Sequence, residues 1–264
     1  MSYIPPYEGQ SLACTVLRLE RSSIHDGSGF RTVVFFKGCP LRCQWCSTPE
    51  SQLRQVEQTQ DGAKTYGQVM SVEDILREVR KDIPFYFHSG GGMTLSGGEV
   101  LVQHTAAAAL LRQARREGID TAIETSFFAP VTAVEEVLPY VNTAFVDLKL
   151  YDKARHLTCC GAENGCILYN LLHTNEMDWK GKLVVRIPLV PGINDDREEL
   201  AQMGRFCAEL TKLDHVQLLP YHKLGVDTYR KLGRTYQLPE TPIPTAEHME
   251  ACRAIIREYF PSVI

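Results

Sequence analysis

The chain has 264 residues, of which 44% are hydrophobic and 23% are charged, and its net charge is -4. These values are typical of a soluble globular protein, and the net charge predicts no binding of nucleic acid or of an anionic membrane. No apolar run reaches the ~18 residues of a membrane span. Residues Met1 to Gln10 lack the basic start and apolar core of a signal peptide. We therefore expect a cytoplasmic protein.

Short β-rich runs alternate with amphipathic helical runs along the whole chain, without a repeat or a linker, so we expect one domain over residues 1–264. Strands are predicted at Leu12 to Glu20 (an edge strand), Thr32 to Phe36, Met93 to Leu95, Thr121 to Glu124, Thr143 to Leu150, Leu183 to Leu189 and His215 to Leu219. Helices are predicted after the cap Ser71 (apolar face Val72, Ile75, Leu76 and Val79), at Gln103 to Glu117 before Gly118, at Val131 to Leu138, Cys166 to His173 and Asp196 to Leu213, and after the cap Thr245. The polar segment Ser51 to Gly67 is predicted to be a loop or a short helix.

The order of these elements gives six strand–helix units, which predict an α/β fold with a parallel sheet and right-handed crossovers. Six units are too few for a closed eight-stranded barrel. We therefore expect an open, partial (β/α)6 barrel or a wound sheet. In both folds the functional site lies at the carboxyl ends of the strands.

Residues with unusual chemistry lie late in, or directly after, five of the six predicted parallel strands and within the fifth strand, so we expect all of them to converge on one face. In chain order they are the cysteines from Cys39 to Cys46, then Gly97-Gly98-Glu99, Glu124-Thr125-Ser126, Asp147 with Lys149, Arg186, and His222.

Three cysteines, Cys39, Cys43 and Cys46, follow the first of these strands with the spacing C-x3-C-x2-C. The chain has nine cysteines, an odd number, and in the reducing cytosol such a cluster indicates a metal or a catalytic site rather than disulfides. Structural zinc needs four ligands, usually in C-x2-C pairs, and no second pair is present. Thiolates also suit a four-iron, four-sulfur (4Fe-4S) cluster, in which three protein ligands leave one iron open. A zinc site and buried free thiols remain the alternatives.

The residues around the cysteines resemble a known family over about Arg21 to Tyr236. The most specific segments are Asp26 to Arg31 (DGSGFR), Phe36 to Cys46 (FKGCPLRCQWC), Pro49 to Ser51, and Ser89 to Glu99 (SGGGMTLSGGE). The cysteine spacing is that of the radical S-adenosylmethionine (SAM) superfamily. The preceding DGSGFR segment and the internal Trp45 resemble the glycyl-radical-enzyme activating enzymes, the group that includes the pyruvate formate-lyase activase.

This resemblance implies a reaction. The open iron chelates the amino and carboxylate groups of SAM, and the reduced cluster passes one electron to the sulfonium. The C–S bond breaks to methionine and a 5′-deoxyadenosyl radical, which abstracts hydrogen from a backbone glycine of a partner glycyl-radical enzyme. The protein contributes the cluster potential, the orientation and a dry site.

The resemblance also assigns roles to residues. The expected cluster ligands are Cys39, Cys43 and Cys46, and Asp26 is expected to meet the partner peptide. Lys149 is expected to neutralise the SAM carboxylate, and Glu124 and Asp147 to hold the ribose, the amino group or a monovalent cation. The full set expected around SAM is Trp45, Gly97, Gly98, Glu99, Glu124, Thr125, Ser126, Asp147, Lys149, Arg186 and His222.

Each assignment has a simpler structural alternative. The glycines can make a tight strand-to-helix turn, Arg186 can form a structural ion pair, and a single histidine such as His222 is usually structural. Glu124 and Asp147 lie in otherwise apolar strands, where an unpaired charge is costly. The remaining cysteines are expected to be ordinary: Cys14, Cys207 and Cys252 in the core, and Cys159, Cys160 and Cys166 without a second cluster.

The chain departs from the family at Ser28, Phe30, Thr48 and Phe127, of which the last replaces a frequent glycine. Many activases carry an inserted ferredoxin-like segment, but the interval from Ser47 to Met70 contains no cysteine. We therefore expect a single cluster, a monomer, and reduced flavodoxin or ferredoxin as an external electron donor. Two competing interpretations are a radical SAM enzyme acting on a small molecule or another peptide, and a zinc-stabilised or electron-carrying binding protein.

Overall fold

The computed structural model describes residues 12–264, so the segment Met1 to Gln10 lies outside the described residues. Eight strands form one sheet in the order β10-β9-β8-β7-β6-β2-β1-β5. They are β1 (Ala13–Ser23), β2 (Arg31–Phe36), β5 (Gln68–Ser71), β6 (Gly92–Gly97), β7 (Asp120–Thr125), β8 (Thr143–Asp147), β9 (Lys182–Leu189) and β10 (Leu213–Pro220). The helices are α1 (Val72–Arg80), α2 (Ile83–Ser89), α3 (His104–Arg116), α4 (Val131–Val137), α5 (Lys153–Cys160), α6 (Gly165–His173), α7 (Arg197–Ala208), α8 (Val226–Lys231) and α9 (Ala246–Arg257).

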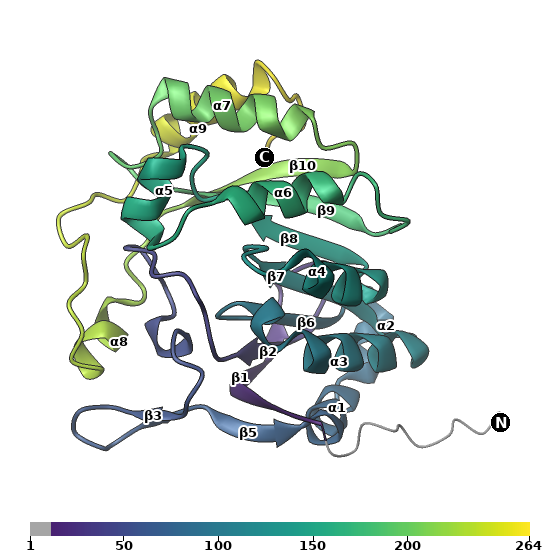
Figure 1. Ribbon diagram of the computed structural model, residues 1–264. Coiled ribbons are helices and arrows are strands. Elements are labelled where there is room, and N and C mark those ends of the chain that lie inside the picture. Colours follow the sequence, from purple (N-terminus) through teal and green to yellow (C-terminus); the bar gives the residue numbers. More distant parts are fainter. Residues whose placement is uncertain (1–11) are drawn as a thin grey trace.

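The six strands β2, β6, β7, β8, β9 and β10 are parallel neighbours in chain order. The sheet ends at β10 on one side and at β5 on the other, so it remains open. The prediction of an α/β fold with an open, partial barrel of six strand–helix units is confirmed. Figure 1 shows α1, α3, α4, α6 and α7 following one another along one side of the sheet. The helices α5 and α8 lie beyond the ends of the strands.

Several predicted boundaries were wrong. The first strand is not at the edge, because β5 pairs with it on the side away from β2. The segment after Ser51 contains a small hairpin, β3 (Glu57–Gln58) with β4 (Thr65–Tyr66), instead of a plain loop or a helix. The strand predicted to reach Leu150 ends at Asp147, and α7 ends at Ala208. The helices α2, α5 and α8 were not predicted, because each spans only six to eight residues and its apolar pattern is too short to recognise.

The predicted helix signals are present as hydrogen bonds. The hydroxyl of Ser71 accepts from the backbone N–H of Asp74 at 3.1 Å, and that of Thr245 accepts from His248 at 3.2 Å. Gly118 follows α3 with a left-handed φ of 75°. These bonds satisfy backbone groups that a helix leaves unpaired at its ends, so the caps define where α1, α3 and α9 begin or end.

One face of the sheet forms the main core against the helices. Val34, Leu95, Ile123, Val146 and Val185 come from five neighbouring strands, are fully buried, and belong to one apolar cluster with side chains of the helices. Fully burying each such side chain contributes about 1.5–3 kcal/mol. Because side chains alternate along a strand, the residues before and after these point to the opposite, inner face.

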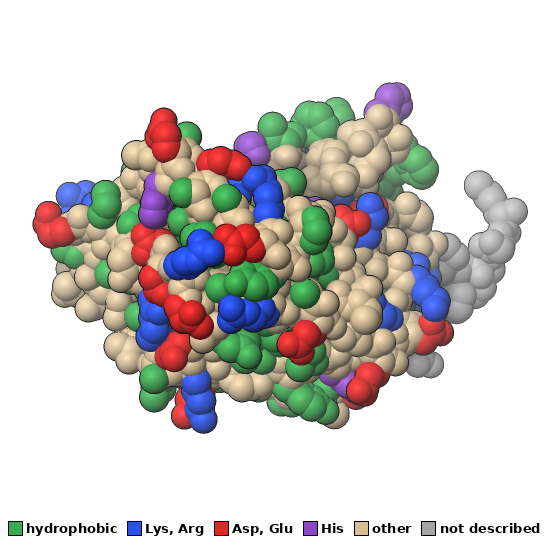
Figure 2. All heavy atoms as spheres, turned by 90° about the horizontal axis from the view of Figure 1, so that it is seen from above, with side chains coloured by type: hydrophobic (Ala, Val, Ile, Leu, Met, Phe, Trp, Pro, Cys, Tyr) green, Lys and Arg blue, Asp and Glu red, His purple; other side chains and the backbone are tan. Residues whose placement is uncertain are grey.

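No helix within residues 12–264 has both the length and the hydrophobicity needed to cross a bilayer. On the face above α7 and α9, acidic and basic side chains are interspersed without a large patch of one sign (Figure 2). One ion pair of this kind joins the start of α7 to the end of α9, with 2.8 Å between Arg197 and Glu258.

Phe127, just after β7, has a left-handed backbone with a φ of 58° and a fully buried ring. This conformation explains why a residue without a side chain suits the position. It costs about 1–2 kcal/mol for a residue other than glycine. Burial of the ring offsets the cost, since removing a buried Phe side chain costs about 3–5 kcal/mol. The Phe127 carbonyl also accepts a 2.8 Å hydrogen bond from the side-chain amide of Asn170.

We expect Phe127→Gly to lower the free energy of unfolding by roughly 2–4 kcal/mol, because lost packing exceeds relieved strain. Phe127→Ala is expected to be less stable still, by about 0.5–1 kcal/mol, because alanine keeps the unfavourable φ. Denaturant unfolding of both variants measures the difference. Leu110, inside α3, is the control position: its alanine variant is expected to be more stable than its glycine variant by about 1 kcal/mol. An alanine variant at 127 that is more stable than the glycine variant would contradict the account.

Candidate active site

The cysteine loop, residues 38–47, follows β2 and is fixed to two other segments by backbone hydrogen bonds. Gly38 donates to Ser51 at 2.7 Å and Cys39 donates to Gln52 at 3.0 Å. The Gly38 carbonyl accepts from Glu99, which follows β6, at 2.8 Å. The loop is therefore attached to the carboxyl ends of β2 and β6, as the parallel sheet predicts.

The three thiols of this loop are free and partly buried, and they lie close enough to influence one another electrostatically. Burial, followed by the charge on Glu99, raises the pKa of Cys39 to about 12. Burial, followed by Cys43, raises the pKa of Cys46 to about 11. The neighbouring thiol of Cys160, followed by burial, raises the pKa of Cys43. The thiols are thus protonated in the free protein, and a metal that binds thiolates must displace their protons.

A single metal ion and an iron–sulfur cluster need different arrangements of their ligands. Within residues 12–264, no three His, Cys, Asp or Glu side chains are close enough together to hold one metal ion. Zinc would require four such ligands around one point. Cysteines that bind the separate irons of a cluster do not converge on a single point, and thiolates are the ligands such clusters take.

The glycine turn after β6 has a packing reason. Gly97 has a φ of 113°, and a Cβ there would lie 2.3 Å from the Phe36 carbonyl oxygen. A Cβ on Gly98 would lie 2.4 Å from the Gly38 carbonyl oxygen. Only glycine lets this turn lie against the start of the cysteine loop. The structure thus bears out the simpler interpretation of a tight turn.

Glu99 is buried and accepts four hydrogen bonds from protein groups. Its carboxylate accepts from the backbone N–H of Leu101 at 3.0 Å and of Ser126 at 2.9 Å, and from the hydroxyls of Thr125 and Ser126. Glu99, Thr125 and Ser126, three residues that were expected around SAM, are therefore joined in one network. This network ties the turn after β6 to the end of β7.

Glu124 and Arg186 form an ion pair on the inner face of the sheet. The hydroxyl of Ser96 donates to Glu124 at 2.6 Å, and Arg186 donates through Nε to Gln217 at 3.1 Å. The guanidinium lies 3.9 Å above the centre of the Phe145 ring. Burial raises the pKa of the Glu124 carboxyl, and the charge on Arg186 opposes this rise. The two charges are thus paired, as their position in apolar strands requires.

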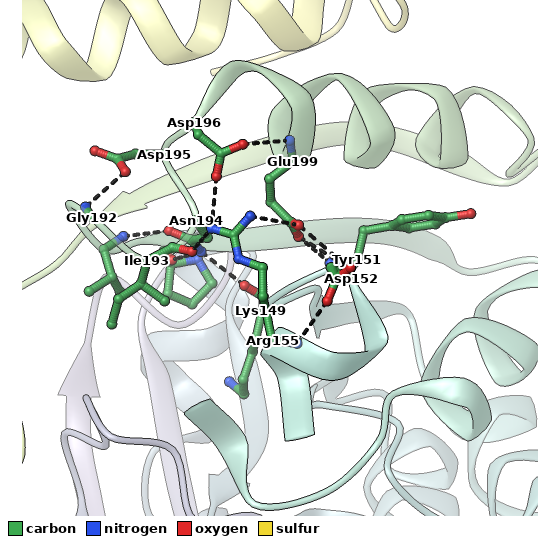
Figure 3. Close-up of polar contacts among 12 residues, drawn as sticks. Lys149, Tyr151, Asp152, Arg155, Gly192, Ile193, Asn194, Asp195, Asp196 and Glu199 are labelled. Atoms are coloured by element: carbon green, nitrogen blue, oxygen red, sulfur yellow. Dashed lines mark hydrogen bonds and ion pairs between the residues drawn. The ribbon is translucent and has the colours of Figure 1, made fainter. Parts of the chain in front are cut away.

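Lys149, just beyond β8, pairs with Asp147 at 2.6 Å. Burial lowers the pKa of Lys149, but the neighbouring Asp147 carboxylate outweighs burial, so the lysine pKa is raised. Lys149 is therefore a partly buried cation near Cys43 of the loop. Its backbone is fixed as well, because the side-chain amide of Asn194 donates to the Lys149 carbonyl at 2.9 Å (Figure 3).

Asn194 and Glu199 connect the segment after β8 with the segment after β9. Asn194 also donates to the Pro188 carbonyl at 2.8 Å and accepts from the Val190 N–H at 2.7 Å. Glu199, which is buried in α7, accepts from the Tyr151 N–H and pairs with Arg155 at 3.4 Å (Figure 3). This network holds the start of α5 against the start of α7.

The other three predicted site residues are placed less centrally. Trp45 is buried in a small apolar cluster with Leu150 and Tyr221, so it packs the loop onto the segments after β8 and β10. His222 is exposed and has a 3.4 Å contact with the N–H of Leu224, which does not connect it to the other site residues. Asp26 lies near Glu124. Burial is the main cause that raises the pKa of the Glu124 carboxyl, and the charge on Asp26 adds to it.

The sequence pattern indicates no role for four residues that the structure places in or beside the site. Cys160 contacts the cysteine loop, Gln217 binds Arg186, and Asn194 and Glu199 hold the backbone near Lys149. The sequence around Asn194 could have indicated its role, because Asn194 follows Pro191-Gly192 after a strand, where turn residues make such hydrogen bonds. The indication for Cys160 is weaker: two adjacent cysteines precede Gly161 at the end of a helix.

Comparison with known proteins agrees with this arrangement. A sequence model of the radical SAM superfamily matches residues 33–204. The isethionate sulfite-lyase activating enzyme of Oleidesulfovibrio alaskensis is 34% identical, with 95% of this chain and 96% of the relative covered. That alignment spans 301 positions, more than the 264 residues of this chain, so the relative contains residues that this chain lacks.

Two further proteins are similar. The choline trimethylamine-lyase activating enzyme of the same organism is 33% identical over 93% of this chain and 96% of its own length. Among solved structures, a domain of the pyruvate-formate lyase-activating enzyme from Bacteroides vulgatus is 28% identical, with a TM-score of 0.55, and covers 66% of this chain and 98% of that domain. The chain belongs to the radical SAM superfamily and, within it, to the activating enzymes of glycyl-radical enzymes.

Proposed function

We propose that Cys39, Cys43 and Cys46 bind one 4Fe-4S cluster whose open iron faces SAM. The observation that carries the proposal is the position of the three thiols, near the partly buried cation Lys149 and at the carboxyl ends of β2 and β6. When bound, the cluster supplies the electron that cleaves the sulfonium C–S bond of SAM to methionine and a 5′-deoxyadenosyl radical. The partly buried loop limits water around the thiolates.

The SAM site extends over the inner face of the sheet. Lys149 and Arg186 supply positive charge for the SAM carboxylate, and Asp147 and Glu124 supply carboxylates for the ribose hydroxyls, the amino group or a monovalent cation. Each of these four charges is already paired in the protein, so SAM would join existing pairs rather than meet isolated charges. The Gly97–Gly98 turn, with Trp45, Glu99, Thr125, Ser126 and His222, completes the proposed surroundings.

Asp26 is proposed to meet the glycine-bearing segment of the partner. It follows β1, and its backbone carbonyl accepts a 2.8 Å hydrogen bond from Thr94 on the inner face of β6. The Asp26 side chain lies near Glu124, so this loop lies next to the proposed SAM site. A glycine held there would be close to the radical, which abstracts a hydrogen atom from it.

Reduced flavodoxin or ferredoxin delivers the electron directly, because the chain has no cysteines for additional clusters between Ser47 and Met70. The enzyme acts as a monomer in the cytoplasm and under anaerobic conditions, where a partly exposed cluster survives.

Replacing any one of Cys39, Cys43 and Cys46 by alanine is expected to abolish binding of a stable four-iron cluster, because only two thiolates remain. Iron and sulfide content and the electron paramagnetic resonance (EPR) signal after anaerobic reconstitution measure this. Cys207→Ala, which removes a buried thiol in α7, is the matched control and should keep wild-type iron content. A stoichiometric zinc content in protein isolated anaerobically, with no iron uptake, would refute the cluster.

Incubation of the reduced, reconstituted protein with SAM and a glycyl-radical enzyme is expected to give 5′-deoxyadenosine and a glycyl radical EPR signal on the partner. A partner variant with alanine in place of its radical glycine should give no such signal. Formation of deoxyadenosine without a glycyl radical, for every glycyl-radical enzyme encoded beside this chain, would instead favour a small-molecule or peptide substrate.

The pair Glu124–Arg186 allows a structural role to be separated from SAM binding. Arg186→Met leaves Glu124 unpaired and is expected to lower the free energy of unfolding by roughly 2–4 kcal/mol, less than the full cost of a completely buried pair. The double variant Glu124→Gln/Arg186→Met should recover most of that stability but still bind SAM at least tenfold more weakly. Denaturant unfolding and equilibrium dialysis with SAM measure the two effects. Wild-type SAM affinity in the double variant would show that the pair is only structural.

A further inference from the structure

The last turn of α5 contacts the cysteine loop on both sides of Cys43. The N–H of Arg42 donates to the Cys160 carbonyl at 2.7 Å, and the N–H of Gln44 donates to the Cys159 carbonyl at 2.9 Å. The side-chain amide of Gln44 reaches the Thr158 carbonyl at 3.3 Å. A helix leaves the carbonyls of its last turn without internal partners. Here the cysteine loop satisfies them, and Cys43 is held between two of these bonds.

Gly161 permits this close approach. It ends α5 with a left-handed φ of 80°, the usual conformation of a glycine that follows a helix. A Cβ on Gly161 would lie 3.1 Å from the Cβ of Arg42. The absence of a side chain therefore lets the helix end lie directly on the loop.

The thiol of Cys160 lies in a dry, apolar environment. Cys160 is 0% exposed and packs in a cluster with Trp45, Leu150 and Tyr221, against which Cys43 is also packed. The two backbone hydrogen bonds on either side of Cys43 hold it against the helix end that carries Cys160. Because no water reaches Cys160, its S–H has no competing acceptor from solvent.

The helix that carries Cys160 is fixed at its other end. The side chain of Asp152 caps α5 by accepting from the Arg155 N–H at 2.7 Å, and Arg155 in turn pairs with Asp196 and Glu199 (Figure 3). Asn164, which follows the helix, donates to the Leu150 carbonyl at 2.9 Å. The position of Cys160 relative to the loop is therefore determined by a network that does not include the cysteines.

We propose that Cys160 is a positioning residue for the cluster, whose thiol donates a hydrogen bond to the sulfur of Cys43 in the loaded enzyme. This inference rests on the proposed cluster at Cys39, Cys43 and Cys46. Hydrogen bonds to cluster sulfurs are one of the factors that set the reduction potential. A donor to the Cys43 sulfur stabilises the extra negative charge of the reduced cluster, so Cys160 raises the potential and makes the cluster easier to reduce.

Cys207 provides the comparison for an ordinary buried thiol. It is also 0% exposed, and burial alone raises its pKa to about 12. It lies in the main core with side chains of the helices rather than with the cysteine loop. Loss of its thiol should affect packing as loss of Cys160 does, but it should leave the cluster unchanged.

The test is a redox titration, followed by EPR, of anaerobically reconstituted wild type, Cys160→Ala, Cys160→Ser and Cys207→Ala. We expect a more negative midpoint potential for Cys160→Ala, and no such shift for Cys160→Ser, whose hydroxyl is still a donor, or for Cys207→Ala. Pulsed EPR after exchange into deuterium oxide should show one exchangeable proton coupled to the wild-type cluster that Cys160→Ala lacks. If the alanine variant does not retain its cluster, Cys160→Val, which fills the space without a donor, takes its place.

The outcomes separate this inference from the proposed function. If wild type takes up no iron–sulfur cluster, the proposed function fails and the role of Cys160 fails with it. If wild type is loaded but the variants without a donor keep its potential and its exchangeable proton, only the inference is overturned. An equal shift in Cys207→Ala would assign the effect to general loosening of the core and would also overturn it.

Discussion

The ion pair between Glu124 and Arg186 joins β7 to β9 across β8 on the inner face of the sheet. Helices cover the opposite face, so the inner face is where charged side chains can reach a ligand. Burial there would be costly for an isolated charge, and each acid is accordingly paired with a base: Glu124 with Arg186, and Asp147 with Lys149. The pairing keeps a strongly charged surface at the strand ends without destabilising the fold.

The carboxyl ends of the strands are also held together by backbone contacts, which the glycines make possible. Gly97 and Gly98 bring the end of β6 against Phe36 and Gly38, and Glu99 then bonds to the residues after β7. The start of the cysteine loop is thus attached to β6 and, through Glu99, to β7. A substitution at either glycine would displace the loop as well as the turn, so a packing role and a role at SAM are not exclusive.

Much of this arrangement could be predicted from sequence, for identifiable reasons. The six parallel strands follow from apolar runs that alternate with amphipathic helices, and the cysteine spacing is specific enough to indicate a cluster. The position of the first strand was misjudged because β5 has only four residues and no alternation of apolar and polar residues. The contacts of Cys160 and Glu199 could not be predicted, since they join segments 44 or more residues apart through α5, a helix of eight residues with little amphipathic pattern.

That short helix connects the two halves of the site. Its first turn is tied to α7 through Arg155 and Glu199, and its last turn satisfies its carbonyls with N–H groups of the cysteine loop. A movement of the segment after β9 would therefore be transmitted to Cys43 as well as to Lys149, whose carbonyl is bound by Asn194. The loop that carries the cysteines has no regular structure of its own between residues 38 and 48, so its shape is imposed by these neighbours. The shape of the cysteine loop consequently depends on residues remote from it in sequence, and these lie in segments where hydrophobic periodicity carries little information.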